Sequence, residues 1–228
     1  MKIFFKAVFF LILIVLSIAL LFIGNGYNMY KDAIESTSLE EKVEQIQNKE
    51  NYAKFSELPQ MYINAVISVE DKRFYKHNGI DIFAICRAAI NDIKAMEFVE
   101  GGSTITQQLA KNMYFTREKK IERKIAEVFM TWKIEKNYTK EEIFELYVNS
   151  IFFGDGYYTV KEACKGYFDK ELNEMTDGEC ILLAGIPNAP SVYAPTKNPE
   201  LARERQKKVI EKMIHNGYLT EEEANNIY

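Results

Sequence analysis

Hydrophobic positions are most concentrated at the N-terminus, where one long apolar run precedes a series of amphipathic segments. From Ile3 to Ile23 the only charged residue is Lys6. At about 1.5 Å per helical residue this run spans roughly 30 Å, the thickness of the hydrocarbon core of a bilayer. It therefore predicts a single transmembrane helix. Because Lys2 and Lys6 lie at its start, we expect a cytoplasmic N-terminus and an extracytoplasmic remainder.

A cleaved signal peptide is the alternative interpretation of this run. Ser17-Ile18-Ala19 has the small-x-small pattern of a cleavage site. However, the apolar residues from Leu20 to Ile23 follow this triplet, whereas cleavage normally follows the apolar core. The pattern favours a retained anchor.

Helical spacing dominates the rest of the chain. Apolar residues recur every three or four positions at Tyr62, Ala65, Val66 and Val69, and again at Ile121, Ile125, Val128, Phe129 and Trp132. Capping boxes mark helix starts at Thr104, Thr139, Thr176 and Thr220. We predict an anchor over residues 1–29, a partly helical juxtamembrane stalk over 30–57 and a mainly α-helical domain over 58–228. Trp132 is expected in the core.

Composition fits one folded domain plus an anchor. The chain has 228 residues, of which 47% are hydrophobic, and a net charge of -4 that gives no reason to expect a nucleic-acid partner. Cys86, Cys164 and Cys180 lack metal-ligand spacing and are expected to be small buried hydrophobes. A Cys164–Cys180 disulfide is left open.

The first candidate for chemistry is Glu70, which ends the helix predicted around Tyr62 to Val69. Phe74 and Tyr75 follow it, so its carboxylate could be partly desolvated and act as a base. The alternative is a surface glutamate paired with Lys72 or Arg73. His77 lacks a nucleophile motif, and we expect it to be structural.

A glycine-rich turn supplies the second candidate. Gly101-Gly102-Ser103 precedes a helix start, where free N–H groups favour anions. Gln107 and Gln108 add amides that can bind sugar or phosphate oxygens. The alternative is a plain helix cap.

A basic segment supplies the third candidate. It contains Lys111, Arg117, Lys119, Lys120, Arg123 and Lys124 against two acidic residues, Glu118 and Glu122. Several cations suit a diphosphate, whose charge is spread over many oxygens. Glu127 shares a helix face with Arg123 and Lys124 and could hold a metal ion or order these cations. The alternative is a solvated face with surface ion pairs.

These motifs, in the order in which they follow one another along the chain, resemble those of the peptidoglycan glycosyltransferases of glycosyltransferase family 51. They are Glu70-Asp71-x-x-Phe74-x-x-His77-x-Gly79, the octapeptide from Gly101 to Gln108, and Arg123-Lys124-x-x-Glu127. Further matches run through Tyr147-Val148-Asn149 to Gly185-Ile186-Pro187-Asn188-Ala189-Pro190-Ser191. The similarity covers about residues 55 to 228.

The resemblance implies a lysozyme-like, mainly α-helical fold with a small membrane-proximal subdomain. It implies inverting transfer of a lipid-linked growing glycan to the 4-hydroxyl of lipid II, with release of undecaprenyl diphosphate. Other cell-wall synthesis proteins are potential partners. No cofactor is obligatory, although a divalent cation, Mg²⁺ or Mn²⁺, could bind at Glu127.

The resemblance also implies roles for individual residues. Glu70 would be the base and Glu127 a second essential carboxylate, while Lys111 and Lys119 would face the donor diphosphate. Further substrate contacts would come from Asp71, Phe74, Ser103, Thr104, Gln107, Gln108, Arg123 and Lys124.

The sequence leaves two alternative functions open. A lysozyme-like hydrolase could use paired carboxylates, but a neutral leaving group would not need the basic segment. A non-catalytic scaffold is the second alternative, although both carboxylates are present. The chain lacks a Ser-x-x-Lys motif paired with Lys-Thr-Gly or Lys-Ser-Gly, so we expect a monofunctional glycosyltransferase rather than one joined to a transpeptidase.

Overall fold

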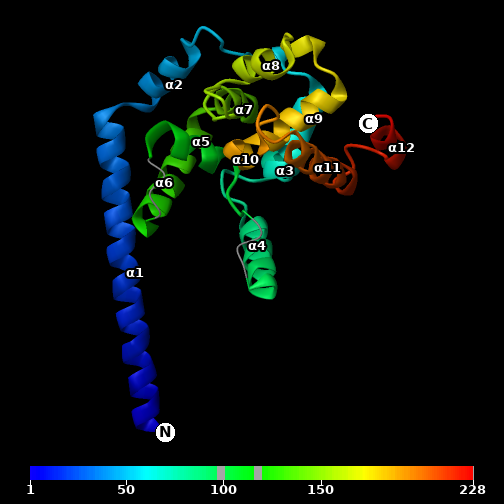
Figure 1. Cartoon of the computed structure of the whole chain (residues 1–228). Helices are drawn as coiled ribbons and strands as arrows, with labels where there is room; N and C mark the ends of the chain where they lie inside the picture. Colours follow the sequence, from blue (N-terminus) through cyan, green and yellow to red (C-terminus); the bar gives the residue numbers. More distant parts are fainter. Residues whose placement is uncertain (97–100, 116–119, 228) are drawn as a thin grey trace.

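The computed structural model describes residues 1–96, 101–115 and 120–227 (Figure 1). In these ranges the only β feature is an isolated bridge between Gly154 and Tyr157, which confirms the predicted mainly α-helical class. The helices are α1 Lys2–Ser36, α2 Leu39–Gln47, α3 Gln60–Glu70, α4 Ile82–Ala95, α5 Ile105–Tyr114, α6 Ile121–Asn137, α7 Lys140–Val148, α8 Val160–Phe168, α9 Asp177–Gly185, α10 Pro190–Tyr193, α11 Pro199–His215 and α12 Glu221–Asn225, with four short 3₁₀ turns: η1 Phe55–Glu57, η2 Phe74–Lys76, η3 Leu172–Glu174 and η4 Ile186–Asn188.

The N-terminal helix α1 is one continuous rod of 35 residues that projects from the head of the molecule (Figure 1). At about 1.5 Å per residue it is roughly 50 Å long, more than the hydrocarbon thickness of a membrane. It is long and apolar enough to cross a membrane, and its described N-terminal apolar side chains are exposed. A membrane crossing would therefore account for only part of the length of this helix.

The C-terminal part of α1 packs against α6. Tyr27 and Tyr30 lie with ring centroids 5.2 Å and 5.9 Å from that of Phe129 on α6. Trp132 contacts the other side of Phe129 at 5.8 Å but stays 52% exposed. The prediction of a core tryptophan is therefore wrong. The apolar stripe of α6 faces α1, and Trp132, the last aromatic residue of this stripe, lies at the edge of the contact between the two helices.

Residues 30–57 do not form a separate stalk. The apolar face of α2, formed by Leu39, Val43 and Ile46, is buried in the main core. The Asn149 side chain, just after α7, also accepts from the Ala53 N–H at 2.9 Å and donates to the Ala53 carbonyl at 2.8 Å. The boundary predicted at residue 58 is corrected accordingly, because this segment is held by side chains nearly a hundred residues away.

Helix α3 lies within the core of the head, packed against α9 and α11, while α5 packs on α6 and α7. All four predicted capping boxes are present, at the starts of α5, α7, α9 and α12. The three cysteines are free, so no Cys164–Cys180 disulfide forms. Cys164 and Cys180 are buried as expected, whereas Cys86 is exposed on α4, contrary to the prediction.

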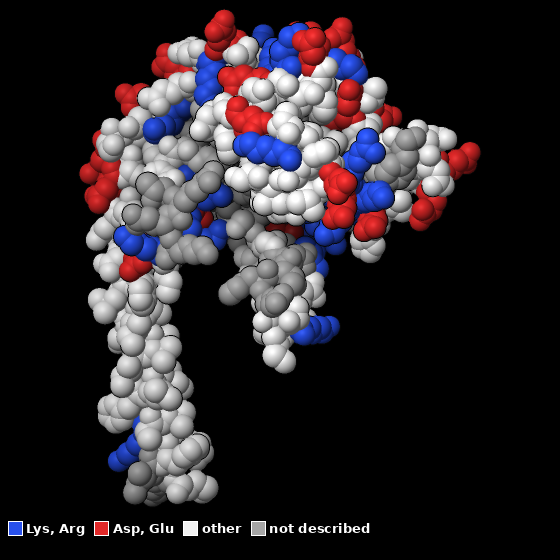
Figure 2. Space-filling view, in the orientation of Figure 1, with Lys and Arg blue, Asp and Glu red and all other residues white. Residues whose placement is uncertain are grey.

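Helix α4 projects from the head toward the same side as the N-terminal part of α1 (Figure 1). Its exposed apolar residues are Ile82, Phe83, Ile85, Ile90 and Ile93, with Met96 just after it. Charged side chains gather on the head, whereas the lower part of α1 is nearly uncharged and the described part of α4 carries few charges (Figure 2). The two protrusions thus expose apolar surface in one direction, as a membrane-proximal region requires.

Candidate active site

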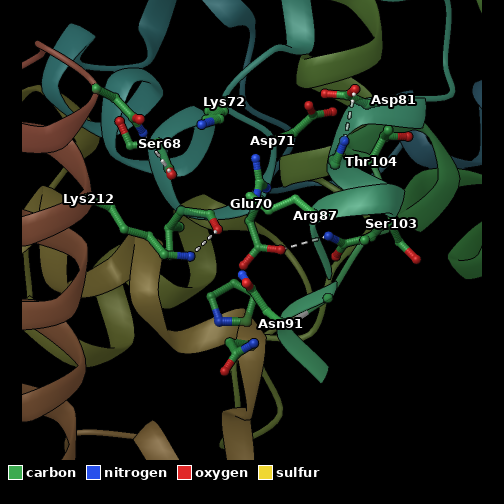
Figure 3. Close-up of a pocket in the computed structure, with 18 of the residues that line it drawn as sticks. Ser68, Glu70, Asp71, Lys72, Asp81, Arg87, Asn91, Ser103, Thr104 and Lys212 are labelled. Carbon is green, nitrogen blue, oxygen red and sulfur yellow. Dashed lines mark hydrogen bonds between the residues drawn. The ribbon is translucent and has the colours of Figure 1, made fainter. Parts of the chain in front are cut away.

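Glu70 is the last residue of α3 and lines a cavity of about 550 Å³. Its side chain is half-buried, and the Nε2 of Gln108 on α5 donates to its Oε2 at 2.7 Å (Figure 3). The two residues are 38 positions apart, so the contact depends on the tertiary structure that brings the end of α3 to α5. The structure therefore joins the first and second candidate motifs at a carboxylate.

Asp71 makes the next link between these motifs. It is buried and accepts from the Ile105 N–H at 3.1 Å, at the start of α5. It also accepts from His77 Nε2 at 2.9 Å, and the Gly79 N–H donates to His77 Nδ1 at 3.1 Å. These two contacts together assign the proton to Nε2. The expectation of a structural His77 is confirmed.

Gly79 must be glycine in this arrangement. Its φ is +87°, and an added Cβ would lie 2.5 Å from the Cγ2 of Thr131. Its carbonyl accepts from the Thr104 hydroxyl at 2.6 Å, a third link to the start of α5. A substitution here would strain the turn and press on Thr131 of α6.

Asp71, His77 and Asp81 bring potential metal ligands within 4.8 Å of one another. Asp81, however, caps α4 by accepting from the Ala84 N–H at 3.1 Å and pairs with Arg73 Nε at 3.2 Å. Asp71 already accepts from two protein donors. Both carboxylates are therefore already engaged by donors and cations of the protein itself, and we assign the cluster a structural role.

The glycine-rich turn forms one wall of the cavity. Gly101, Gly102, Ser103 and Thr104 line it, as Gln108 does one turn into α5. Gln107 does not appear among the described lining residues, because its amide oxygen accepts from the Thr104 N–H at 3.1 Å and its side chain is buried. The structure thus gives Gln107 a capping role in place of the substrate contact implied by the resemblance.

Phe74 also lies away from the substrate contact that the resemblance implies for it. Its side chain is fully buried, with its ring 6.2 Å from that of Phe144, and the Lys140 ammonium lies 4.7 Å from its centroid. It therefore supports the turn after Glu70 from within the core rather than touching substrate.

Glu127 lies on α6 and is only 1% exposed. One carboxylate oxygen pairs with Arg123 and the other with Lys124 at 3.0 Å. Lys124 also donates to the Ser103 hydroxyl at 2.8 Å, which joins the third motif to the glycine-rich turn. Glu127 thus reaches the cavity wall through a cation rather than directly.

The Lys124 ammonium is electrostatically unusual, although its side chain is still 46% exposed. Partial loss of surrounding water, together with the positive charges of Arg123 and Lys111, lowers its pKa to about 8. Lys111 on α5 is therefore close enough to act on Lys124, and it also lines the cavity. Lys119, the other predicted diphosphate ligand, lies outside the described residues.

The cavity has a second basic wall that sequence reasoning missed. Arg205, Lys212 and His215 of α11 line it, together with Lys72 and Arg87. The Lys212 ammonium lies 3.4 Å from the Val69 carbonyl oxygen, beside Glu70 (Figure 3). No local signal marks these α11 residues, because only the packing of α11 against α3 brings them to the cavity.

Comparison with known proteins agrees with this arrangement. Residues 37–214 match the family model described as Transglycosylase. Penicillin-binding protein 1A of Aquifex aeolicus is 45% identical over 175 residues, which are 77% of this chain and 24% of that protein. A Cupriavidus necator protein named as a transglycosylase is 41% identical over 170 residues, covering 75% of this chain and 73% of that protein.

A crystal structure of penicillin-binding protein 1A from Haemophilus influenzae aligns with a TM-score of 0.47 and 24% identity, over 77% of this chain and 17% of that one. This chain spans about a quarter of the length of the penicillin-binding proteins 1A that it matches. The family match covers the motifs around Glu70, Ser103 and Glu127 and most of the head. The chain belongs to the transglycosylase family, that is, to the peptidoglycan glycosyltransferases that its motifs resemble.

Proposed function

We propose that this protein polymerises lipid II into β-1,4-linked glycan. It would transfer the lipid-linked growing chain to the 4-hydroxyl of lipid II and release undecaprenyl diphosphate. The observation that carries the proposal is the position of Glu70. This carboxylate lies in a cavity with basic residues on both α5 and α11.

In this mechanism Glu70 removes the proton from the acceptor 4-hydroxyl. The hydroxyl oxygen then bonds to the anomeric carbon of the donor while the bond from that carbon to the diphosphate oxygen breaks. Attack from the face opposite the diphosphate inverts the anomeric configuration. A positioned base typically contributes about 10²–10⁴ in rate.

The departing diphosphate carries the electron pair and needs cations. Lys111 lines the cavity, and Lys124 lies next to it beside Ser103. Glu127 holds Lys124 in place from behind and pairs with Arg123 through its other oxygen. A divalent cation, Mg²⁺ or Mn²⁺, would add charge compensation here, but both Glu127 oxygens already face protein cations, so it would have to displace one of them.

The arrangement favours transfer over hydrolysis of finished glycan. An inverting glycosidase needs a second carboxyl group free to face the sugar. Asp71, Asp81 and Glu127 are each engaged by protein donors or cations. A neutral leaving group would also gain nothing from the basic walls. A purely structural scaffold would not need an accessible carboxylate in such a cavity.

We also propose that α1 anchors the protein with its N-terminus in the cytoplasm and the head outside. Lys2 and Lys6 at the start of α1 support this orientation. The exposed apolar side of α4 would rest on the same membrane. Because Ala84, Arg87 and Asn91 of α4 line the cavity, this placement would bring the cavity close to the lipid tails of both substrates. Other cell-wall synthesis proteins are proposed partners, without an assigned surface.

The test is Glu70→Gln in the full chain, assayed for glycan polymers with purified lipid II. The amide keeps the size of the side chain but cannot accept the proton, so we expect a loss of about 10²–10⁴ in rate. Glu50→Gln is the matched control, since Glu50 is exposed and outside the cavity. Near-normal polymerisation by the Glu70 variant would refute the assignment.

A further inference from the structure

The Gln108 side chain bridges Glu70 to a tyrosine inside the core. Its Nε2 donates to Glu70 Oε2 at 2.7 Å, and its Oε1 lies 3.4 Å from the hydroxyl of Tyr147. Tyr147 is on α7, is completely buried and lies behind the described lining of the cavity. Among the described residues, the hydrogen-bonded connection of this hydroxyl to the site runs through the amide.

The two ends of an amide side chain have opposite hydrogen-bonding character. With Nε2 toward Glu70, the amide donates to an ionised carboxylate. If the amide were flipped, its oxygen would face the carboxylate and repel the ionised form that a base requires. A hydroxyl that donates from the far side of Gln108 disfavours this flip, because the flip would replace its acceptor oxygen with an NH₂ group.

Tyr147 is suited to be that donor. Burial, aided by the negative charges of Glu70 and Asp71, raises the pKa of its hydroxyl well above the ordinary value. The hydroxyl therefore keeps its proton over the whole physiological pH range.

We propose that Tyr147 and Gln108 are positioning residues for the base: Tyr147 fixes the amide of Gln108, and Gln108 engages Glu70 Oε2, so that Oε1, which has no partner among the described residues, is left for the acceptor proton. This inference rests on the proposed function and deepens it. It also changes the role of Gln108, which the family resemblance implies to be a substrate contact.

Tyr62 on α3 provides a matched control. It is also completely buried, and the charge of Glu70 also helps to raise its pKa. Among the described residues, however, its hydroxyl has no hydrogen-bond partner. Tyr147→Phe and Tyr62→Phe each remove one buried hydroxyl near Glu70, and only the first breaks the connection through Gln108.

The experiment measures polymerisation of lipid II by the full chain in detergent for Tyr147→Phe, Tyr62→Phe, Gln108→Leu and the Tyr147–Gln108 double variant. A single neutral hydrogen bond corresponds to roughly a threefold to tenfold effect. We expect kcat of Tyr147→Phe to fall by that factor with KM unchanged, and Tyr62→Phe to keep the wild-type kcat. Thermal melts of the two phenylalanine variants check that both fold.

The double variant is the decisive comparison. If Tyr147 acts through Gln108, Tyr147→Phe should cause no further loss once Gln108 is leucine. Wild-type kcat in Tyr147→Phe, an equal loss in Tyr62→Phe, a rise in KM alone, or additive losses in the double variant would each overturn the inference. Activity in Glu70→Gln would instead refute the proposed function, so the two failures are distinguishable.

Discussion

Because α1 packs closely on α6, a substitution at this contact can test whether the anchor influences the candidate active site. Gly26 on α1 is buried at this contact. A Cβ added there would lie 2.6 Å from Cβ and Cγ2 of Ile125 and 2.9 Å from the Glu122 carbonyl oxygen. Carbon atoms pack at about 3.5–4.0 Å, so the helices would have to separate by roughly 1 Å.

Such overpacking costs about 1–3 kcal/mol, because the contacted atoms belong to the backbone or to its first side-chain carbon. This corresponds to a shift of roughly fivefold to 150-fold away from the docked arrangement. Arg123 and Lys124 lie between Glu122 and Ile125 on α6, and Glu127 lies within one further turn. Gly26→Ala should therefore disturb the cations that we propose to face the diphosphate.

The assay compares Gly26→Ala with Gly24→Ala in liposomes that contain lipid II. A Cβ at Gly24 meets nothing within 4 Å among the described residues. Both changes add the same helix propensity, about 1 kcal/mol, so that effect cancels in the comparison. We expect slower polymerisation and faster amide exchange in the first two turns of α6 only for Gly26→Ala, with both variants sedimenting with the membrane.

A wild-type rate and wild-type exchange in Gly26→Ala would show that docking of α1 does not influence the site. Equal losses in the two variants would assign the effect to the helix in lipid rather than to the contact with α6. Either result would refute the reasoning from packing.

Two further predictions follow from titration and burial. Because the pKa of Lys124 is lowered to about 8, its ammonium loses its charge as the pH rises through that value. The affinity for a phosphoglycolipid donor analogue, measured by calorimetry, should therefore fall between about pH 7 and 9, and Lys124→Arg should remove this fall because a guanidinium stays charged. Burial raises the pKa of the Cys164 thiol to about 11 and that of Cys180 to about 12, so both stay protonated and covered. Maleimide should label only the exposed Cys86 in the folded chain, counted by mass spectrometry, and labelling of all three cysteines under native conditions would contradict the burial.

Local signals made several elements predictable from the sequence. Each capping box places a hydroxyl and a carboxyl or amide three residues apart, and this spacing alone satisfies the first N–H groups of a helix. The end of α3 at Glu70 also followed from its apolar stripe. These features depend on neighbours within one turn, which a sequence displays directly.

Features that depend on tertiary contacts could not be predicted in this way. The polar residues after Ile23 continue α1 as a helix while Tyr27 and Tyr30 pack on Phe129. The charged segment before residue 58 appeared solvated, yet one face of α2 enters the core. In both cases the partner lies about ninety to a hundred residues away, and the deciding interaction is burial of an apolar face rather than local propensity.

The two carboxylates of the site also show why residue type alone could not assign their roles. Glu127 is buried between Arg123 and the half-exposed Lys124, and protonating it would remove its charge from both ion pairs. The described contact of Glu70 is with a neutral amide, which can remain in place when the other carboxylate oxygen takes a proton. These contacts agree with the proposal that Glu70 is the base, while Glu127 holds the cations proposed to face the leaving group.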